Sequence, residues 1–379
     1  MNLILFLGSG VSRPAGMPMV DCLTDSVLDR SYWKECESGG DYFSKSGQHW
    51  DRGPVHHVQQ FLQNLFEHKK RFLNERYIPC DPSYEDLYYL CSQIQHDASV
   101  TTDRFIKQIK RENITLFRAA NQDGVKRRLA DFASLGMELI ERVVWEELRK
   151  QPKTEEGKVV GFDLLREILH RAEIERIHII TLNHDTLVER VLQEEGVSGY
   201  TDGFGRLDEK SLRWYEPNSF FSESQACVSL IKLHGSINWF LFDKKVGPFM
   251  EQSRKRIDRY AIANNYSKDV PNFLTGTDKE LIYNSGIFAD MYEAFINALR
   301  QSQRILMSGF GWNDRGISLV LKNWLERDER NRLLLLHKDS DELRRFQING
   351  MNDYGRGQIL RSDKWFCETG LGEVLPHLT

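Results

Sequence analysis

Short apolar runs that end abruptly in small or polar residues recur along this chain of 379 residues. Such runs are typical of buried parallel strands, each of which ends in a loop at the carboxyl edge of the sheet. The segments between the runs are long enough for crossover helices, so the pattern predicts an α/β fold with a Rossmann-like parallel sheet and helices on both faces. The expected strands cover residues 3–7, 177–182, 228–233, 305–308 and 333–337.

The long stretch between the first two expected strands has a different pattern. Over residues 58–73 and 105–149, apolar residues recur at helical spacing among charged ones, which predicts a large, mainly helical insertion after the first strand. Polar stretches at 38–54 and 151–161 are expected to be loops, and residues 338–379 indicate no more than a partly structured cap. The predicted domains are a sheet domain, residues 1–30 and 160–379, and the insertion, residues 31–159.

Composition and charge exclude several classes of protein. The formal net charge of −4 supplies no positive field, so direct nucleic-acid binding is not expected. No apolar stretch is long enough to span a bilayer and no basic segment precedes the N-terminal apolar run, so we expect a cytoplasmic protein that does not contact membranes. The six cysteines are scattered without zinc-type pairs, so we expect neither a metal site nor a disulfide framework.

The first expected strand ends at the loop Gly8-Ser9-Gly10. Glycines without side chains allow a sharp turn and the close approach of a pyrophosphate to backbone amides at a helix N-terminus. The spacing departs from the usual dinucleotide fingerprint, because the next glycine is Gly16. Taken alone, the loop is equally well explained as an ordinary turn.

The second strand leads into Asn183-His184-Asp185. Side chains alternate along extended chain, so Asn183 and Asp185 are expected to point the same way and His184 the opposite way. Asn183 and Asp185 therefore form a candidate ligand-binding pair. The alternative is that one of them caps the helix expected over residues 186–192.

His234 follows the third strand and precedes Gly235. An imidazole changes charge near neutral pH, and the neighbouring glycine allows a ligand to come close, so His234 is the best candidate for a general base. The alternative is a structural histidine, hydrogen-bonded at the entrance of a loop.

The fourth strand ends in Ser308-Gly309, which repeats the strand-to-glycine pattern. Such a turn can offer hydroxyl and amide donors to a second part of a dinucleotide, and Phe310 or Trp312 could stack on a base. For the following Asn313 and Asp314, the alternative role is to cap the helix expected over residues 317–325.

In this order, the four segments resemble the sirtuin-like (silent information regulator) NAD-binding family, in particular its bacterial NAD-hydrolase branch. The stretch 273–277, followed by Tyr283, Gly286 and Phe288, is also similar to sequence of that branch. The resemblance runs from Met1 to about Leu336 and covers residues 31–150 only loosely. It implies catalytic positions for Asn183 and His234, and NAD-contacting positions for Gly8, Ser9, Gly10, Asp185, Ser308 and Gly309.

Departures from the protein-deacylase sirtuins indicate a different reaction. Those enzymes carry paired cysteines for a structural zinc, a glutamine where this chain has Leu182, and an arginine-bearing continuation where it has residues 17–19. The resemblance therefore implies an NAD glycohydrolase that uses NAD as substrate without a metal and releases nicotinamide and ADP-ribose. A protein deacylase and a non-catalytic module that binds NAD or ADP-ribose are the alternatives.

The biological setting follows from the resemblance alone. Stand-alone members of this branch are similar to NAD-depleting effectors of bacterial anti-phage defence, which act by abortive infection. Chains of this size are often encoded beside a HerA-type ATPase or an Argonaute-like protein, which are the candidate partners here. A homo-oligomer is also expected, and the helical insertion is the candidate surface for self-association or docking. A lid or scaffold is its alternative role.

Overall fold

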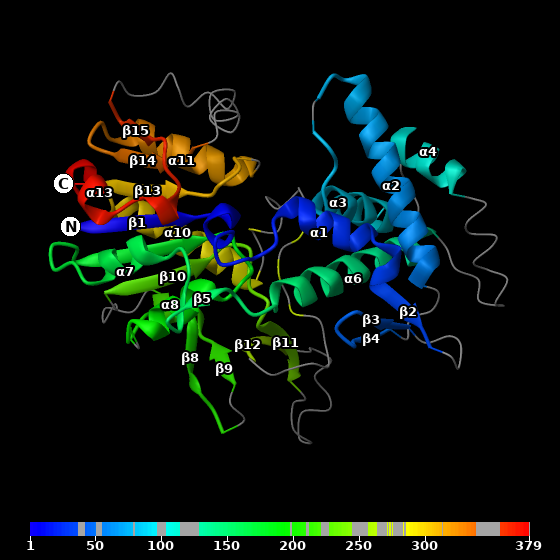
Figure 1. Cartoon of the computed structure of the whole chain (residues 1–379), viewed down its shortest axis with the longest axis horizontal. Coiled ribbons are helices and arrows are strands. Elements are labelled where there is room, and N and C mark those ends of the chain that lie inside the picture. Colours follow the sequence, from blue (N-terminus) through cyan, green and yellow to red (C-terminus); the bar gives the residue numbers. More distant parts are fainter. Residues whose placement is uncertain are drawn as a thin grey trace. The chain divides into compact units, whose positions relative to one another are not determined.

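Contacts along the chain divide it into two compact units, each described here by itself (Figure 1). The sheet unit comprises Met1–Met17, Lys150–Leu274 and Lys279–Thr379, and the helical unit comprises Pro18–Arg149 with Thr275–Asp278. The computed structural model describes residues 1–36, 42–50, 55–78, 80–96, 104–113, 129–197, 199–209, 212–220, 227–244, 257–263, 271, 273, 275, 283, 286–312, 314–338 and 357–378.

A six-stranded parallel sheet forms the centre of the sheet unit, which confirms the predicted fold class. Each of the five expected strands is present within one residue at either end. The sixth strand, β15, was not predicted, because it is short, half-exposed and lacks an apolar run. In spatial order the strands are β10 (Val228–Lys232), β7 (Arg176–Thr181), β1 (Asn2–Leu7), β13 (Arg304–Ser308), β14 (Arg332–Leu336) and β15 (Ile359–Ser362).

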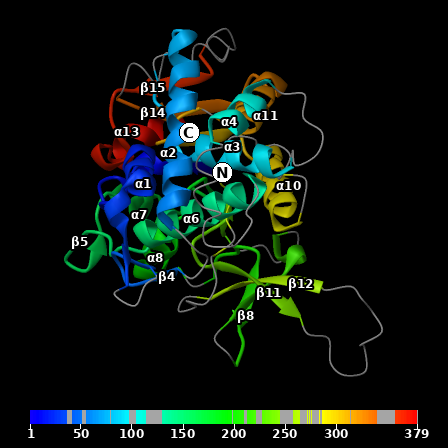
Figure 2. The same cartoon turned by 90° about the vertical axis from the view of Figure 1, so that its right-hand side faces the viewer.

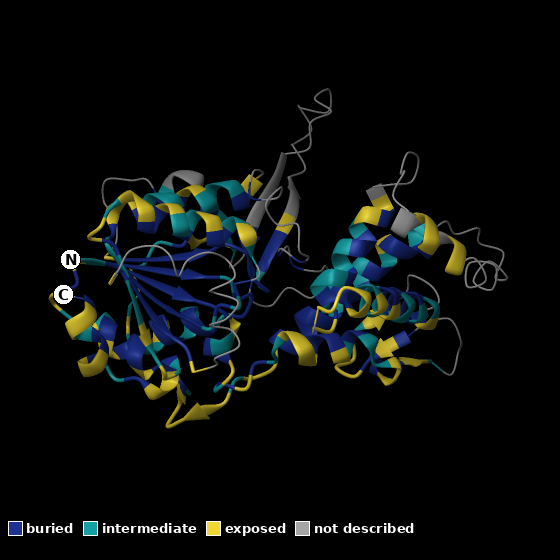
Figure 3. Cartoon of the chain, turned by 90° about the horizontal axis from the view of Figure 1, so that it is seen from above, coloured by how far each residue is buried: buried dark blue, intermediate teal, exposed yellow. Residues whose placement is uncertain are grey.

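Helices cover both faces of this sheet (Figure 3). Ile4 and Phe6 of β1 pack with α10 (Gly286–Gln301) and α11 (Arg315–Arg327). Leu3, Leu5 and Leu7 pack on the opposite face with α7 (Asp163–Leu169), α8 (Leu187–Glu194) and α13 (Leu371–Leu378). Because both faces are buried, β1 appears in the sequence as an uninterrupted apolar run. Burial of each large apolar side chain contributes about 1.5–3 kcal/mol.

A second, antiparallel sheet in the same unit was not predicted, because its strands are short and pair across gaps in the sequence. Asp202 anchors it: its buried carboxylate accepts hydrogen bonds from both terminal nitrogens of Arg213, at 2.8 and 2.7 Å. In spatial order its strands are β11 (Trp239–Lys244), β12 (Ile257–Ile262), β9 (Arg213–Tyr215) and β8 (Phe204–Leu207), with the 3-10 turn η4 (Pro217–Phe220) following β9.

The expected loop at 151–161 is instead a β-hairpin of β5 (Thr154–Glu155) and β6 (Lys158–Val159). Its two connecting residues, Glu156 and Gly157, both have positive φ, as a tight hairpin turn requires. A two-residue turn of this kind needs little apolar sequence, so the polar composition of the stretch concealed it.

The helical unit contains the helices expected over residues 58–73 and 105–149, although residues 114–128 lie outside the described part (Figure 2). Gly136 lies in the middle of its last helix, where a Cβ would come within 3.1 Å of both Cys91 Sγ and Leu62 Cδ2. The absent side chain thus allows three helices to pack closely. The helices are α1 (Val20–Leu28), α2 (Val55–Glu75), α3 (Tyr84–His96), α4 (Arg104–Glu112) and α6 (Leu129–Leu148).

The loop expected at 38–54 is wrong for the residues that the structure describes there. After the 3-10 turn η2 (Arg30–Tyr32), the strands β2 (Trp33–Glu35), β3 (Tyr42–Ser44) and β4 (His49–Trp50) form a small antiparallel sheet. A loop was predicted because this stretch has few branched apolar residues. Buried aromatic residues stabilise the sheet instead: the rings of Trp33 and Trp50 pack with centroids 5.7 Å apart.

Three glycines bring the loops after β1 and β13 into backbone contact. Gly8 N donates to Ser308 O at 2.9 Å, and Gly10 N donates to Gly309 O at 3.3 Å. A Cβ on Gly8 would lie 2.2 Å from Gly309 O, and one on Gly10 would lie 2.9 Å from Gly309 Cα. Gly309 has a φ of +72° and is enclosed by the backbone of residues 8–11. The glycines are therefore required by the packing of the protein itself.

We expect Gly309→Ala and Gly8→Ala each to lower the free energy of unfolding by about 2–5 kcal/mol, because backbone cannot move aside as a flexible side chain can. Urea denaturation followed by tryptophan fluorescence measures the effect. Gly199→Ala is the control, since Gly199 is exposed and nothing lies within 4 Å of the position that its added methyl group would take. Equal stability of Gly309→Ala and Gly199→Ala would contradict the proposed role of the glycine contact.

Candidate functional site

The four loops singled out in the sequence meet at one edge of the parallel sheet. β7, β1 and β13 are adjacent, with Leu7 paired to both Thr181 and Ser308 in the strand register, and Lys232 at the end of β10 is paired to Thr181. All four strands run in the same direction, so their carboxyl ends share this edge. The edge carries every predicted site residue: Gly8, Ser9, Gly10, Asn183, Asp185, His234, Ser308 and Gly309.

Ser12 connects the β1 loop to the candidate pair after β7. The Ser12 hydroxyl donates to Asp185 Oδ2 at 2.8 Å, and Asn183 Nδ2 donates to Ser12 Oγ at 2.9 Å and to Gly8 O at 3.1 Å. Asn183 and Asp185 therefore do turn toward the same loop, as strand alternation suggested. All three side chains are at least nine-tenths buried.

Asp185 also contacts the start of α8, although the N-cap of that helix is Thr186 and neither Asn183 nor Asp185. Its Oδ1 accepts a hydrogen bond from the amide of Leu187 at 3.0 Å, at the first residue of α8. Asn183 makes no such contact among the described residues, and its buried Oδ1 has no hydrogen-bond partner there. A buried amide oxygen without a partner costs stability, so it identifies the acceptor at this edge that is available to a ligand.

The β7 and β10 loops are joined through the backbone of His184. Its carbonyl accepts hydrogen bonds from the amide of Ile237 at 2.9 Å and from the hydroxyl of Ser236 at 3.2 Å. The His184 ring packs on Phe273, with centroids 4.7 Å apart, and its centroid lies 6.1 Å from that of His234. These contacts hold the loop that carries Asn183 next to the loop that carries His234.

His234 is buried, and its Nε2 atom is held by two side chains. Nε2 lies 2.7 Å from Tyr283 Oη and 3.2 Å from Asp314 Oδ2, and the Tyr283 hydroxyl donates to the same Asp314 oxygen at 2.7 Å. An imidazolium formed at His234 would thus face a carboxylate directly. This arrangement suits a base that becomes positively charged during a reaction.

Asp314 combines helix capping with its contact to His234. Its Oδ1 accepts from the amide of Ile317 at 3.0 Å at the start of α11, while its Oδ2 faces His234 and Tyr283. Burial alone would raise the pKa of Asp314, but the hydrogen bond and charge of His234, with the Ile317 amide and the Tyr283 hydroxyl, hold that pKa well below its usual value. Asp314 is therefore ionised throughout the neutral range. The other capping candidate, Asn313, lies outside the described residues.

The β13 loop contributes its backbone to the edge more than its side chains. The Ser308 hydroxyl donates to Leu336 O at 3.0 Å inside the sheet, so its hydrogen is used within the protein. Phe310 and Trp312 are buried and pack together with centroids 5.0 Å apart, and Phe310 also lies 5.3 Å from Phe6. The hydrophobic core thus accounts for both rings that the sequence offered for base stacking.

Sequence reasoning missed Ser12, Tyr283 and the second role of Asp314. Ser12 belongs to the first glycine loop, so its place in that motif was the available signal. Tyr283 stood only in a stretch that resembles family sequence, and Asp314 was recognised only as a helix cap. Nothing local in the sequence connects Tyr283 with His234, which is 49 residues away.

An ion pair between Lys232 and Glu189 stabilises the backbone of the candidate site. Lys232, at the end of β10, is 2% exposed; its Nζ lies 2.8 Å from Glu189 Oε1 and also donates to the backbone carbonyl of Asp185. The ammonium therefore links β10 to α8 and fixes the main chain of a candidate site residue. The deeply buried Lys232 charge is tolerated because it has the partly buried Glu189 carboxylate as its partner.

Residues 177–352 match the family model of the SIR2-like domain. The match begins in β7 and includes Asn183, Asp185, His234, Ser308 and Gly309, whereas the glycine loop after β1 lies outside the matched range. It supports a sirtuin-like family and an activity related to NAD. None of the curated proteins matches the chain.

Two observations concern other classes of site. Among the residues that the structure describes, no three His, Cys, Asp or Glu side chains are grouped as the ligands of a metal ion would be. Over the same residues, no helix has the length and apolar character that crossing a membrane requires.

We expect Lys232→Met to lower the free energy of unfolding by about 3 kcal/mol, because it leaves the partly buried Glu189 carboxylate without its cation. Chemical denaturation monitored by circular dichroism measures the loss. The double variant Lys232→Met/Glu189→Leu should recover part of it, since both charges are then removed. A double variant no more stable than Lys232→Met would show that the pair does not act as a unit.

Proposed function

We propose that the chain is an NAD glycohydrolase, which cleaves the bond between nicotinamide and ribose to give nicotinamide and ADP-ribose. The observation that supports this most is the convergence of Asn183 and His234. They follow adjacent parallel strands at one edge and lie in loops joined by hydrogen bonds to the His184 carbonyl. The match to the SIR2-like domain favours NAD as the substrate.

The reaction suits these residue types. The nicotinamide of NAD is a cationic leaving group: when its bond to C1′ of the ribose breaks, the electron pair goes to the ring nitrogen and nicotinamide departs neutral. No strong general acid is required, so the carboxylate pair of most glycosidases is dispensable. Water then forms the new C1′–O bond and loses a proton to a base or to solvent. The protein has to stabilise the positive charge on the ribose and to position the water.

In this proposal His234 accepts a hydrogen bond or proton from a ribose hydroxyl, Asn183 orients the ribose and the attacking water through its Oδ1, and Asp185 contacts the nicotinamide amide. Asp185 can accept this hydrogen bond in addition to those from Ser12 and Leu187, because each carboxylate oxygen carries two lone pairs. The loop of Gly8, Ser9 and Gly10, with the turn at Ser308 and Gly309, is proposed to lie against the phosphates. The amides of Gly8 and Gly10 already donate to Ser308 O and Gly309 O, so their contribution is the close approach that a glycine allows.

Tyr283 and Asp314 extend the proposal to the control of His234. Because Tyr283 Oη lies 2.7 Å from Nε2, a ribose hydroxyl that binds at Nε2 has to displace the tyrosine hydroxyl. Asp314 Oδ2, which lies 3.2 Å from the same Nε2, then stabilises the imidazolium. In these terms Asp314 is a positioning residue, and Tyr283 occupies the place of the substrate hydroxyl.

The wider setting is a further part of the proposal and is supported by the sequence resemblance alone. We assign catalysis to residues 1–30 and 160–379 and assembly or scaffolding to residues 31–159. The chain would act in the cytoplasm as an NAD-depleting effector of anti-phage defence, as a homo-oligomer or with a HerA-type ATPase or an Argonaute-like partner.

His234→Ala and Asn183→Ala should each lower the rate of nicotinamide release, the former by about 10²–10⁴-fold because general-base assistance is lost. Chromatography of the products of purified protein and NAD measures the rate, and circular dichroism checks the fold. His170→Ala is the matched control, since His170 also pairs with a carboxylate, Glu195 at 2.8 Å, but is 60% exposed.

The same assay separates the alternatives. Release that requires an acylated peptide would identify a deacylase, and NAD binding without turnover would identify a binding module. Because such an enzyme can be inactive in isolation, the assay is repeated with the product of the neighbouring gene. Turnover by His234→Ala equal to that of His170→Ala would remove His234 from the mechanism.

Asp314→Asn should lower kcat by about 10–100-fold, with a smaller change in KM, because the charge-assisted contact to His234 is lost. Asparagine still caps a helix, so α11 should be retained. In the wild type Asp314 stays ionised, and its contribution to stability is lost only in acid below its ordinary pKa of about 4. The acidic limb of the kcat/KM profile should move to lower pH in the variant. An unchanged profile with reduced stability would indicate a capping role alone.

A further inference from the structure

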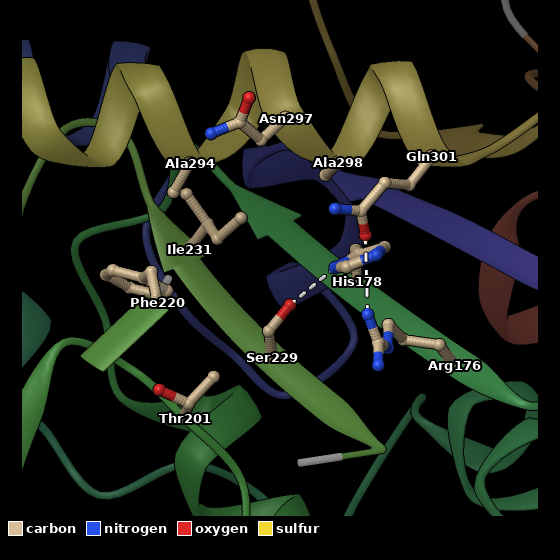
Figure 4. A pocket seen from close by; sticks show the side chains of 10 residues that line it. All are labelled: Arg176, His178, Thr201, Phe220, Ser229, Ile231, Ala294, Asn297, Ala298 and Gln301. Carbon is tan, nitrogen blue, oxygen red and sulfur yellow. Dashed lines mark hydrogen bonds between the residues drawn. The ribbon is translucent and has the colours of Figure 1, made fainter. Parts of the chain in front are cut away.

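A small cavity lies at the opposite, amino-terminal ends of β7 and β10, against α10 (Figure 4). Its volume is about 60 Å³. A single water needs about 10–15 Å³, so the cavity has room for roughly four to six waters or a small molecule, and not for a nucleotide. The lining residues are Arg176, His178, Thr201, Phe220, Ser229, Ile231, Ala294, Asn297, Ala298 and Gln301.

His178 provides the observation that points to a ligand. Its side chain is 6% exposed, and its Nδ1 lies 2.7 Å from Ser229 Oγ. The buried Nε2 atom has no hydrogen-bond partner among the described residues. Burial, with a smaller effect from the charge of Arg176, lowers the pKa of His178 to about 4, so the ring is neutral near pH 7. A serine hydroxyl can donate to Nδ1 or accept from it, and the proposed site requires the tautomer in which Ser229 donates to Nδ1, so that Nε2 carries the hydrogen and can donate it into the cavity.

Two side-chain amides of the lining, those of Gln301 and Asn297, supply further donors. Arg176 Nη1 donates to Gln301 Oε1 at 3.4 Å, and Arg300 Nη1 donates to Asn297 Oδ1 at 3.0 Å. Each contact uses one lone pair of an amide oxygen and turns that oxygen toward an arginine, and the NH₂ groups of Gln301 and Asn297 are the donors of these side chains. None of the described residues along the wall is acidic, and Arg176 brings a full positive charge. The cavity therefore favours an anion.

Part of the wall is apolar. Phe220, Ile231, Ala294 and Ala298 are all buried and line the same cavity. A fully hydrated inorganic ion gains little from such a surface, whereas a short hydrocarbon stem gains about 25 cal/mol for each Å² that it buries. The combination fits an anionic head attached to a small apolar group.

We propose that this cavity is a binding site for a small organic monocarboxylate. The carboxylate takes hydrogen bonds from Nε2 of His178 and from the guanidinium of Arg176, and the stem packs against Phe220 and Ile231. Arg176 and His178 stand at the start of β7 and Asn183 follows its end, so the site is separate from the edge proposed for NAD. The proposal does not depend on the proposed hydrolase activity.

Binding is tested on the full chain without NAD, by isothermal titration calorimetry with isobutyrate, isobutyramide and inorganic phosphate. Isobutyrate should bind in about the millimolar range, as expected for so few atoms. Isobutyramide, which has the same shape but no charge, should bind at least about tenfold more weakly. The imidazole ¹H–¹⁵N signals of His178, assigned by their loss in His178→Gln, should shift as isobutyrate is added.

Two variants and a matched control locate the site. Arg176→Met should weaken isobutyrate binding by about tenfold or more, because it removes the charged donor. Ala294→Leu should abolish binding by filling the cavity while leaving Arg176 in place. Arg332→Met is the control, since Arg332 is also the first residue of a strand of the same sheet but does not line the cavity. Thermal unfolding verifies that each variant folds.

The outcomes that overturn the proposal are distinct from a failure of NAD hydrolysis. Isobutyrate that does not bind, that binds Arg176→Met as well as it binds Arg332→Met, or that binds no better than isobutyramide would each refute it. Binding of phosphate without isobutyrate would assign the cavity to an inorganic oxyanion instead. An inactive enzyme that still binds isobutyrate through Arg176 would leave this site standing.

Discussion

Close contact between two backbone segments is the constraint on which the candidate site depends. The loops after β1 and β13 meet with Gly8, Gly10 and Gly309 in between, and a Cβ at any of these positions would strike backbone. This contact sets the course of the β1 loop, and that course brings the Ser12 hydroxyl to Asn183 and Asp185. The glycines therefore act first through packing, and a close approach by phosphate would use a backbone that packing has already shaped.

Buried polar side chains at the same edge are held by partners from neighbouring helices. Lys232 and Glu189 join β10 to α8, and Asp314 joins the start of α11 to His234. Each charge would be costly to bury alone, so the two members of a pair keep each other in place. The result is a set of loops whose positions are coupled, which is the preorganisation that a reaction without a metal would need.

The sheet was predictable because its signal is local. β1, β7, β13 and β14 are buried on both faces and appear as apolar runs, so their bounds were found within one residue. The smaller sheets were not predicted, because their strands are too short to show a hydrophobic pattern. Aromatic residues such as Trp50 stabilise one of them, and the ion pair between Asp202 and Arg213 stabilises another. Asn183 and His234 were singled out by the same signal as the strands, because each stands directly after an apolar run.

The apolar runs along the chain were sufficient to predict the parallel sheet, and the polar residues at the strand ends marked the loops that meet at its carboxyl edge. The strand order and the contacts across it became visible in the folded chain alone. His234, Tyr283 and Asp314 come from three separate segments, and two oxygens of one carboxylate serve a helix end and an imidazole at once. A linear pattern records which residue types follow one another, whereas such contacts depend on which strands lie next to each other.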